Sequence, residues 1–116
     1  MDVRVTAVMA VMRKSIGTEL SVDVLSRKVN ISPGRLRQLF KRETGQSPMQ
    51  FLRKMRLQQV EQLLGSTYLS IKEIAFLSGF KDVSHFVRDF KKQHGVTPST
   101  FRQLGKASTK GADAVE

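Results

Sequence analysis

The sequence predicts an all-α protein, with seven helices that form two helix-turn-helix subdomains joined by a long linker helix. Three observations lead to this prediction. Apolar residues recur at steps of three and four positions, which is the period of an amphipathic helix. Start and stop signals divide the chain into seven helical segments. The stretch FKRETGQSPMQF at residues 40–51 returns as FKKQHGVTPSTF at residues 90–101.

An apolar stripe predicts the first helix, which Gly17 ends. The stripe consists of Val5, Val8, Met9, Met12 and Ile16. A short second helix begins at a cap at or near Ser21 and ends at Asn30.

The third and fourth helices share one start signal. Ser32-Pro33 opens the third helix and Ser47-Pro48 opens the fourth, because a hydroxyl caps free N–H groups and proline suits the first turn. Gly45 ends the third helix, and the fourth, the predicted linker, runs to Gly65-Ser66.

From Leu69 the same order of signals runs again. One helix turns at Gly79, a second begins after Asp82 and stops at Gly95, and Thr97-Pro98 starts a short last helix. We therefore divide the chain into four parts: a first helix-turn-helix subdomain at 1–47, a linker helix at 48–65, a second subdomain at 66–104 and a disordered tail at 105–116.

The charge balance points to a polyanionic partner. Twenty Lys and Arg stand against ten Asp and Glu, which gives a net charge of +10 and a pI near 10.6. Between Arg27 and Arg56 there are nine basic residues and one acidic residue, Glu43. Nucleic acid fits this density better than a membrane surface or an acidic protein does.

The chain has no cysteine, which excludes disulfides, thiolate metal sites and cysteine nucleophiles. No apolar run reaches the length of a membrane span, and no signal-peptide cleavage site follows the N-terminus. We expect a soluble protein of the bacterial cytoplasm, associated with the nucleoid.

Each copy of the repeat contains a helix, a tight turn and a second helix. Asn30 and Gly79 occupy the turns, where a residue that tolerates positive φ is needed. The second helix of each copy has a polar or basic outer face, and arginine or glutamine side chains can read base edges there. The face of the first copy carries Gly34, Arg37, Gln38 and Lys41. The face of the second carries Ser84, Arg88, Lys91 and Lys92, flanked by Val83 and His85.

The repeated Ser-Pro and Thr-Pro signals place helix N-termini beside these outer faces. A helix N-terminus is a suitable phosphate site, although Ser47 and Thr97 also serve as ordinary caps. A linker helix of residues 48–64 spans roughly 25 Å, so we expect the two outer helices about 34 Å apart, one turn of B-DNA. Tandem copies in one chain predict an asymmetric or directly repeated DNA site.

The chain resembles the DNA-binding domain of the AraC/XylS family of bacterial transcription regulators, from about Val8 to Leu104. The family signature is strongest at residues 70–102, in Ile74-Ala75, Gly79-Phe80, Ser84, Phe86, Arg88, Phe90-Lys91, Gly95, Thr97-Pro98 and Phe101-Arg102. The first copy and the linker match it at Leu25, Ser32-Pro33, Leu36, Phe40-Lys41, Arg53, Arg56-Leu57 and Leu63-Leu64.

This resemblance implies two recognition helices in the major groove. By position, the base-reading residues would be Gly34, Arg35, Arg37, Gln38, Val83, Ser84, His85 and Arg88. We assign DNA phosphate contacts to Ser32, Lys41, Arg42, Ser47, Arg53, Lys81, Lys91, Lys92, Thr97 and Arg102.

The first copy departs from the family pattern. Ser26 and Asn30 replace the usual Ala and Gly, Gly34 offers no side chain, and Gln38 stands where Arg is common. We expect these changes to alter which bases the first unit reads without abolishing binding.

We predict a DNA-binding transcription regulator that occupies promoter DNA and recruits or blocks RNA polymerase, and no enzyme, metal or cofactor. Activation is the commoner role in the family that the chain resembles, but no residue decides between activation and repression. His85 and His94 lack a third ligand at metal spacing, and no nucleophile–base pair or phosphate loop is present. A protein-interaction module and an RNA-binding protein are the alternatives. The chain either acts alone or belongs to a longer regulator with a separate effector or dimerisation domain.

Overall fold

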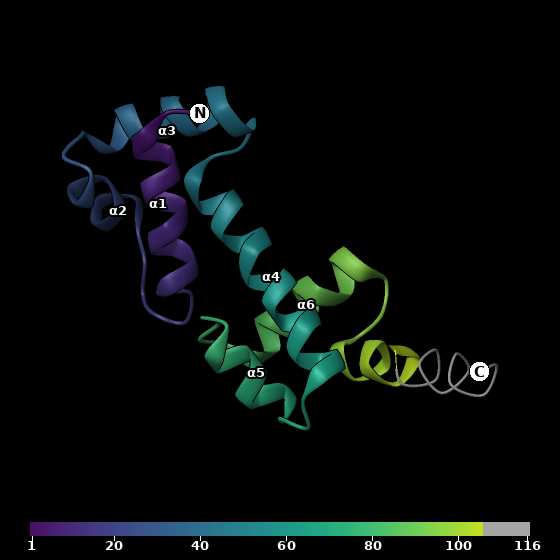
Figure 1. Ribbon diagram of the computed structural model, residues 1–116. Helices are drawn as coiled ribbons and strands as arrows, with labels where there is room; N and C mark the ends of the chain where they lie inside the picture. The colour runs from purple at the N-terminus through teal and green to yellow at the C-terminus, as the bar shows by residue number, and fades with distance from the viewer. Residues whose placement is uncertain (106–116) are drawn as a thin grey trace, which may run out of the picture. The chain divides into compact units, whose positions relative to one another are not determined.

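The computed structural model describes residues 1–105 (Figure 1). Within them, seven helices and no strands are present, as predicted. Six helices are α1 (Val3–Lys14), α2 (Val22–Lys28), α3 (Pro33–Thr44), α4 (Pro48–Ser66), α5 (Ile71–Leu77) and α6 (Val83–His94). The last helix covers residues 98–105. Residues 106–116, most of the predicted tail, lie outside the described part.

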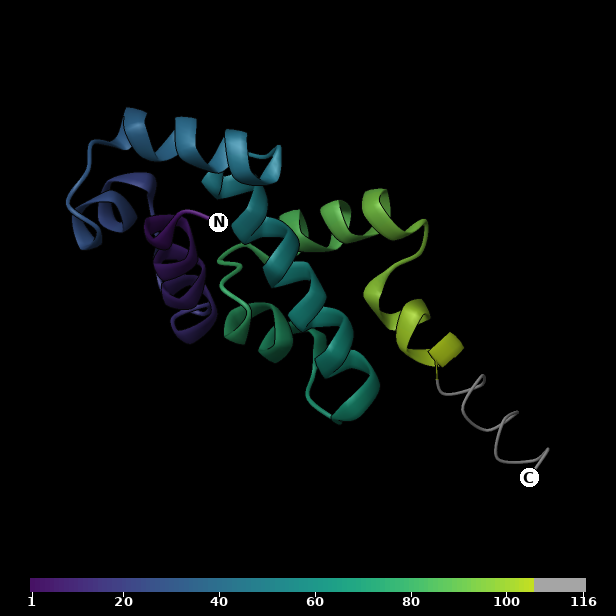
Figure 2. The same cartoon turned by 45° about the horizontal axis from the view of Figure 1, so that its top comes forward.

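The chain forms two compact units: unit 1 is Met1–Arg56, and unit 2 begins at Leu57. In unit 1, α1, α2 and α3 pack against one another (Figure 2). Their shared core contains Val5, Val8, Met9, Met12, Leu25, Leu36, Leu39, Phe40 and Leu52. Phe51, at the start of α4, meets Phe40 edge to face with ring centroids 5.7 Å apart.

In unit 2, the second half of α4 packs with α5 and α6 around a separate core. The core contains Leu57, Val60, Leu64, Ile74, Ala75, Phe86 and Phe90. Helix α5 contributes Ile74 and Ala75 to this core, whereas Leu77 at its end is 47% exposed.

Local capping chemistry sets the helix starts as predicted. The Ser21 hydroxyl accepts a hydrogen bond from Val24 N, and the Ser32 hydroxyl accepts one from Arg35 N. Asp82 does the same for His85 N at the start of α6. These bonds satisfy N–H groups that have no partner inside the helix.

Helix α5 begins with a reciprocal capping box. Glu73 N donates to the Ser70 hydroxyl, and Ser70 N donates to the Glu73 carboxylate. Hydrogen bonds from the Ser70 side chain and backbone lower the pKa of Glu73. The box compensates for the shortness of this seven-residue helix.

Left-handed backbone positions end the helices and form the turns. Asn30 has φ 56°, and Gly79, at the equivalent place in unit 2, has φ 89°. Gly45 and Gly95 cap α3 and α6 at φ 77° and 80°. The predicted need for Asn or Gly in both turns is confirmed.

Two predicted helix ends are wrong by a few residues. Helix α1 ends at Lys14 and not at Gly17, so Ile16 lies in the turn and not on the helix. Helix α2 ends at Lys28, with Val29 as its cap, and not at Asn30. Helix α2 thus ends two residues before Asn30, whose positive φ forms the turn. No helix within residues 1–105 is long and apolar enough to cross a membrane.

We expect Gly79→Ala to lower the free energy of unfolding by about 1–2 kcal/mol, because alanine is strained at positive φ. Gly65→Ala is the matched control, since Gly65 lies in α4 and an added Cβ meets nothing within 4 Å. The control should gain about 0.5 kcal/mol from helix propensity. Urea unfolding followed by circular dichroism measures both. Effects of the same sign would contradict this account of the turn.

Candidate nucleic-acid interface

Helix α3 buries one side in the core of unit 1 and exposes the other. Leu36, Leu39 and Phe40 are buried. Because a helix turns once in 3.6 residues, the residues between them face outward. All four predicted base-reading residues of this helix are exposed, together with two of the predicted phosphate contacts: Gly34, Arg35, Arg37, Gln38, Lys41 and Arg42.

Helix α6 has the same division in unit 2. Phe86 and Phe90 are buried, and Val83 is half-buried. The predicted contacts Ser84, His85, Arg88, Lys91 and Lys92 are exposed. The two helices therefore present matching outer faces, each opposite a buried aromatic anchor.

Most cations on these faces are available to a ligand. Within residues 1–105, no hydrogen bond or ion pair engages the side chains of Arg35, Arg37, Gln38, Arg88, Lys91 or Lys92. Lys41 is different, because its Nζ donates to the carbonyl oxygen of Gly45 at 3.1 Å. An unpaired guanidinium retains all its donors for a base edge or a phosphate.

An acidic group lies within the second face. The His85 Nδ1 is 3.5 Å from Asp89 Oδ2, one helical turn along α6. The i,i+4 spacing of these two residues was visible in the sequence but was not used in predicting the site. Asp89 restrains the imidazole at the start of the helix and adds one negative charge to an otherwise basic face.

The predicted phosphate contacts at helix starts are partly engaged. The Ser32 hydroxyl, exposed before α3, caps that helix, and the half-buried hydroxyls of Ser47 and Thr97 cap α4 and the last helix. Ser47 N also donates to Gln50 Oε1 at 3.0 Å. These bonds engage one N–H group at each of the three helix starts. Arg53 and Lys81 are exposed.

Arg102 serves the fold of unit 2. Its Nε donates to Leu64 O at 3.1 Å and a terminal nitrogen donates to Thr67 O at 3.4 Å, so it closes the C-terminal end of α4. Unit 1 contains the same device, which sequence reasoning did not assign. Arg56 donates to Ile16 O at 3.0 Å and to Thr18 O at 2.8 Å, after the end of α1. Burial lowers the pKa of Arg56.

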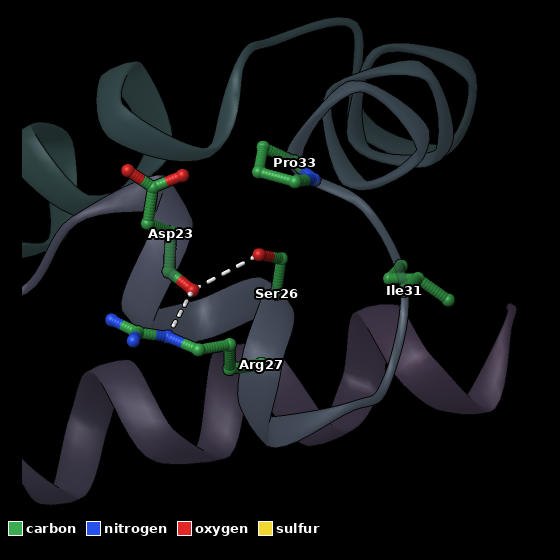
Figure 3. A pocket seen from close by; sticks show the side chains of 5 residues that line it. All are labelled: Asp23, Ser26, Arg27, Ile31 and Pro33. Atoms are coloured by element: carbon green, nitrogen blue, oxygen red, sulfur yellow. Dashed lines mark hydrogen bonds between the residues drawn. The ribbon is translucent and has the colours of Figure 1, made fainter.

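A pocket of about 340 Å³ lies beside α2 and the start of α3, lined by Asp23, Ser26, Arg27, Ile31 and Pro33 (Figure 3). The Asp23 carbonyl oxygen accepts hydrogen bonds from the Ser26 hydroxyl at 3.0 Å and from Arg27 Nε at 3.3 Å.

In the described part of the chain, no buried side-chain nitrogen or oxygen lacks a partner. Residues 1–105 also contain no group of three or more acidic, His or Cys residues that could hold a metal.

Comparison with known proteins agrees with this geometry. Residues 25–104 match the family described as a helix-turn-helix domain. A crystal structure from Chromobacterium violaceum, of a transcriptional regulator of the AraC-type DNA-binding class, superposes with a TM-score of 0.81 at 29% identity. The superposition covers 88% of this chain and 91% of the Chromobacterium chain. The chain belongs to the AraC/XylS family.

Two further relatives place this AraC-type domain among transcription regulators. The transcriptional activator RhaR of Cronobacter sakazakii is 36% identical over 95 residues, 82% of this chain and 34% of that protein. The DNA-binding domain of AdpA, solved with a target DNA, has a TM-score of 0.86 at 25% identity, covering 90% of this chain and 95% of that chain.

The chain is thus the DNA-binding domain of an AraC-type regulator. It spans between 11% and 36% of the length of the first curated relatives that it matches.

We expect Arg102→Ala to lower the free energy of unfolding by about 1–2 kcal/mol, because two carbonyl groups lose a charged donor. Arg42→Ala is the matched control, since Arg42 is exposed on α3 and should cost less than about 0.5 kcal/mol. Urea unfolding without DNA gives both values. Unchanged stability combined with weaker binding to every DNA sequence would instead make Arg102 a phosphate contact.

Proposed function

We propose that the chain binds specific sequences in double-stranded promoter DNA and activates transcription, with α3 and α6 as recognition helices in successive major grooves. The observation that supports this most is the pair of equivalent helices, each with a buried aromatic face and an exposed basic face. The net charge of +10 supports a polyanionic partner.

In this proposal, unit 1 and unit 2 are the two helix-turn-helix subdomains, and α4 is the linker helix. The first unit reads bases through Arg35, Arg37 and Gln38, with the backbone approaching closely at Gly34. The second reads through Val83, Ser84, His85 and Arg88. Arginine pairs with guanine and glutamine with adenine by two parallel hydrogen bonds each.

The phosphate contacts form the rim of the proposed interface. The exposed cations Arg42, Lys91 and Lys92 are the strongest candidates, because no other described group engages them. The remaining proposed contacts are Ser32, Lys41, Ser47, Arg53, Lys81 and Thr97. Arg102 is assigned to the closure of unit 2.

The proposed protein partner is RNA polymerase, contacted when the domain occupies a promoter. Phe76 and Leu77, 75% and 47% exposed on α5, provide apolar area for a protein contact outside the recognition helices. Since the curated relatives are much longer than this chain, we also propose an effector or dimerisation domain in a longer parent protein. We also propose that the chain acts in the bacterial cytoplasm, at the nucleoid, because its relatives are transcription regulators of bacteria.

We expect binding to duplex DNA whose log affinity falls steeply with log salt, because cationic contacts release counterions from the phosphates. Lys91→Ala or Lys92→Ala should weaken binding to all sequences alike and reduce the slope by about 1. Lys14→Ala, at the end of α1 and outside the proposed interface, is the control and should leave the slope unchanged. Fluorescence anisotropy with labelled duplex DNA over a series of salt concentrations measures this slope. Salt-insensitive binding to a protein, with none to duplex DNA, would refute the proposal.

We expect Arg37→Ala and Arg88→Ala each to cost about 1–3 kcal/mol of binding to the preferred site and to relax specificity at one or two base pairs. Selection from random duplex DNA by the original chain and by each variant measures this. Under two-groove binding, the two variants lose preference in different halves of the site, separated by about one turn of B-DNA. Loss at the same base pairs, or equal losses on all sequences, would contradict the assigned roles.

A further inference from the structure

The two units carry the positive charge of the chain unequally. Unit 1 has twelve Lys and Arg against four Asp and Glu, a net charge of +8, and unit 2 has eight against six, a net charge of +2. Helices α3 and α6 account for little of this difference, because α3 has four basic residues and one acidic residue and α6 has three and one. Most of the excess of unit 1 therefore lies outside α3.

The helix before the turn differs most clearly between the two copies. The sixth and seventh residues of α2 are Arg27 and Lys28, and the sixth and seventh residues of α5 are Phe76 and Leu77. Arg27 and Lys28 are exposed, and Phe76 and Leu77 are 75% and 47% exposed. At the same place in the repeat, unit 1 thus presents two cations to solvent and unit 2 presents two apolar side chains.

The fold of the repeat does not require these two cations. Basic residues in the last turn of a helix can stabilise its C-terminal end. Helix α5 has none in its last turn, yet it is seven residues long, as α2 is. Arg27 and Lys28 are therefore available for a role other than holding α2 together.

The end of α2 lies beside the start of α3. Arg27 and Pro33, the first residue of α3, line the same pocket (Figure 3). The Arg27 Nε donates to the Asp23 carbonyl oxygen at 3.3 Å, which leaves the two terminal nitrogens for a ligand. Within residues 1–105, no hydrogen bond or ion pair engages the side chain of Lys28. Free cationic donors thus adjoin the first turn of α3, where the proposed base-reading residues begin.

We propose that Arg27 and Lys28 bind the DNA backbone next to α3, and that unit 1 thereby supplies the larger share of the salt-dependent affinity. The inference rests on the proposed function of α3 in DNA binding. The group bound is a backbone phosphate, because a guanidinium or an ammonium beside the helix donates to phosphate oxygens without reading a base. Unit 2 has no counterpart of this contact, since Phe76 and Leu77 occupy the equivalent positions.

The test compares double variants of the full chain by fluorescence anisotropy with labelled duplex DNA. Arg27→Gln with Lys28→Gln should reduce the slope of log affinity against log salt by about 2, at about 0.9 for each phosphate contact. The ratio of the affinities at 50 and 200 mM salt should then shrink roughly tenfold. Arg13→Gln with Lys14→Gln is the matched control. These exposed residues at the end of α1 carry the same charge in the same unit, and the slope should stay unchanged.

Two further variants separate charge from fold. Phe76→Arg with Leu77→Lys places the cations of α2 on α5, and it should increase the slope by about 2. Arg27→Lys with Lys28→Arg keeps both charges and should keep the original slope. All four side chains are exposed, so circular dichroism should show unchanged helix content and an unchanged urea midpoint in every variant.

Lys91→Gln with Lys92→Gln, on α6, tells a failure of this inference from a failure of the proposed function. If it reduces the slope and the Arg27 and Lys28 variant does not, the α2 contact is wrong and the proposed function stands. An equal reduction in the Arg13 and Lys14 control would also overturn the contact, because net charge alone would explain the loss. An unchanged slope in the α5 variant would refute the equivalence of the two positions. If no form binds duplex DNA, the proposed function and this inference both fail.

Discussion

The apolar sides of α3 and α6 must be buried for either unit to have a core, and this constraint determines which residues face outward. Leu36, Leu39 and Phe40 in one helix, and Phe86 and Phe90 in the other, are the largest contributors from these elements. With 3.6 residues per turn, their burial leaves Arg37 and Arg88 no inward orientation. The outward orientation of these two arginines is thus a geometric consequence of the core.

The turns and the helix caps define where α3 and α6 begin in their units. Positive φ at Asn30 and Gly79 lets the chain reverse between the paired helices, and the caps at Ser32 and Asp82 define where α3 and α6 begin. Arg56 and Arg102 then connect the helix that precedes each pair with the one that follows it. In both copies the local caps and turns and the long-range arginine contacts stabilise the same arrangement of helices, as expected for a sequence that specifies one fold.

Local signals made most of the fold predictable. Caps, glycines and apolar spacing act within four residues, so the seven helices, both turns and the outward face of α3 could be read from the sequence. Contacts that sequence reasoning did not assign depend on distant partners. The carbonyl contacts of Arg102 and the pairing of Glu61 with His94 involve groups 33 to 38 residues apart, for which no spacing rule exists. The contact of Asp89 with His85 could have been predicted, because residues four apart on a helix lie next to each other.

Helix α4 belongs to both copies: Leu52 in its first half completes one core, and Leu57, Val60 and Leu64 in its second half complete the other. Expressing unit 1 and unit 2 separately therefore requires two fragments that overlap in α4, and not two fragments that meet at one boundary. Division between Arg56 and Leu57 would leave each piece with a half-helix of between two and three turns, too short to be stable by itself. Fragments that each keep residues 48–66 would retain a whole helix for their core.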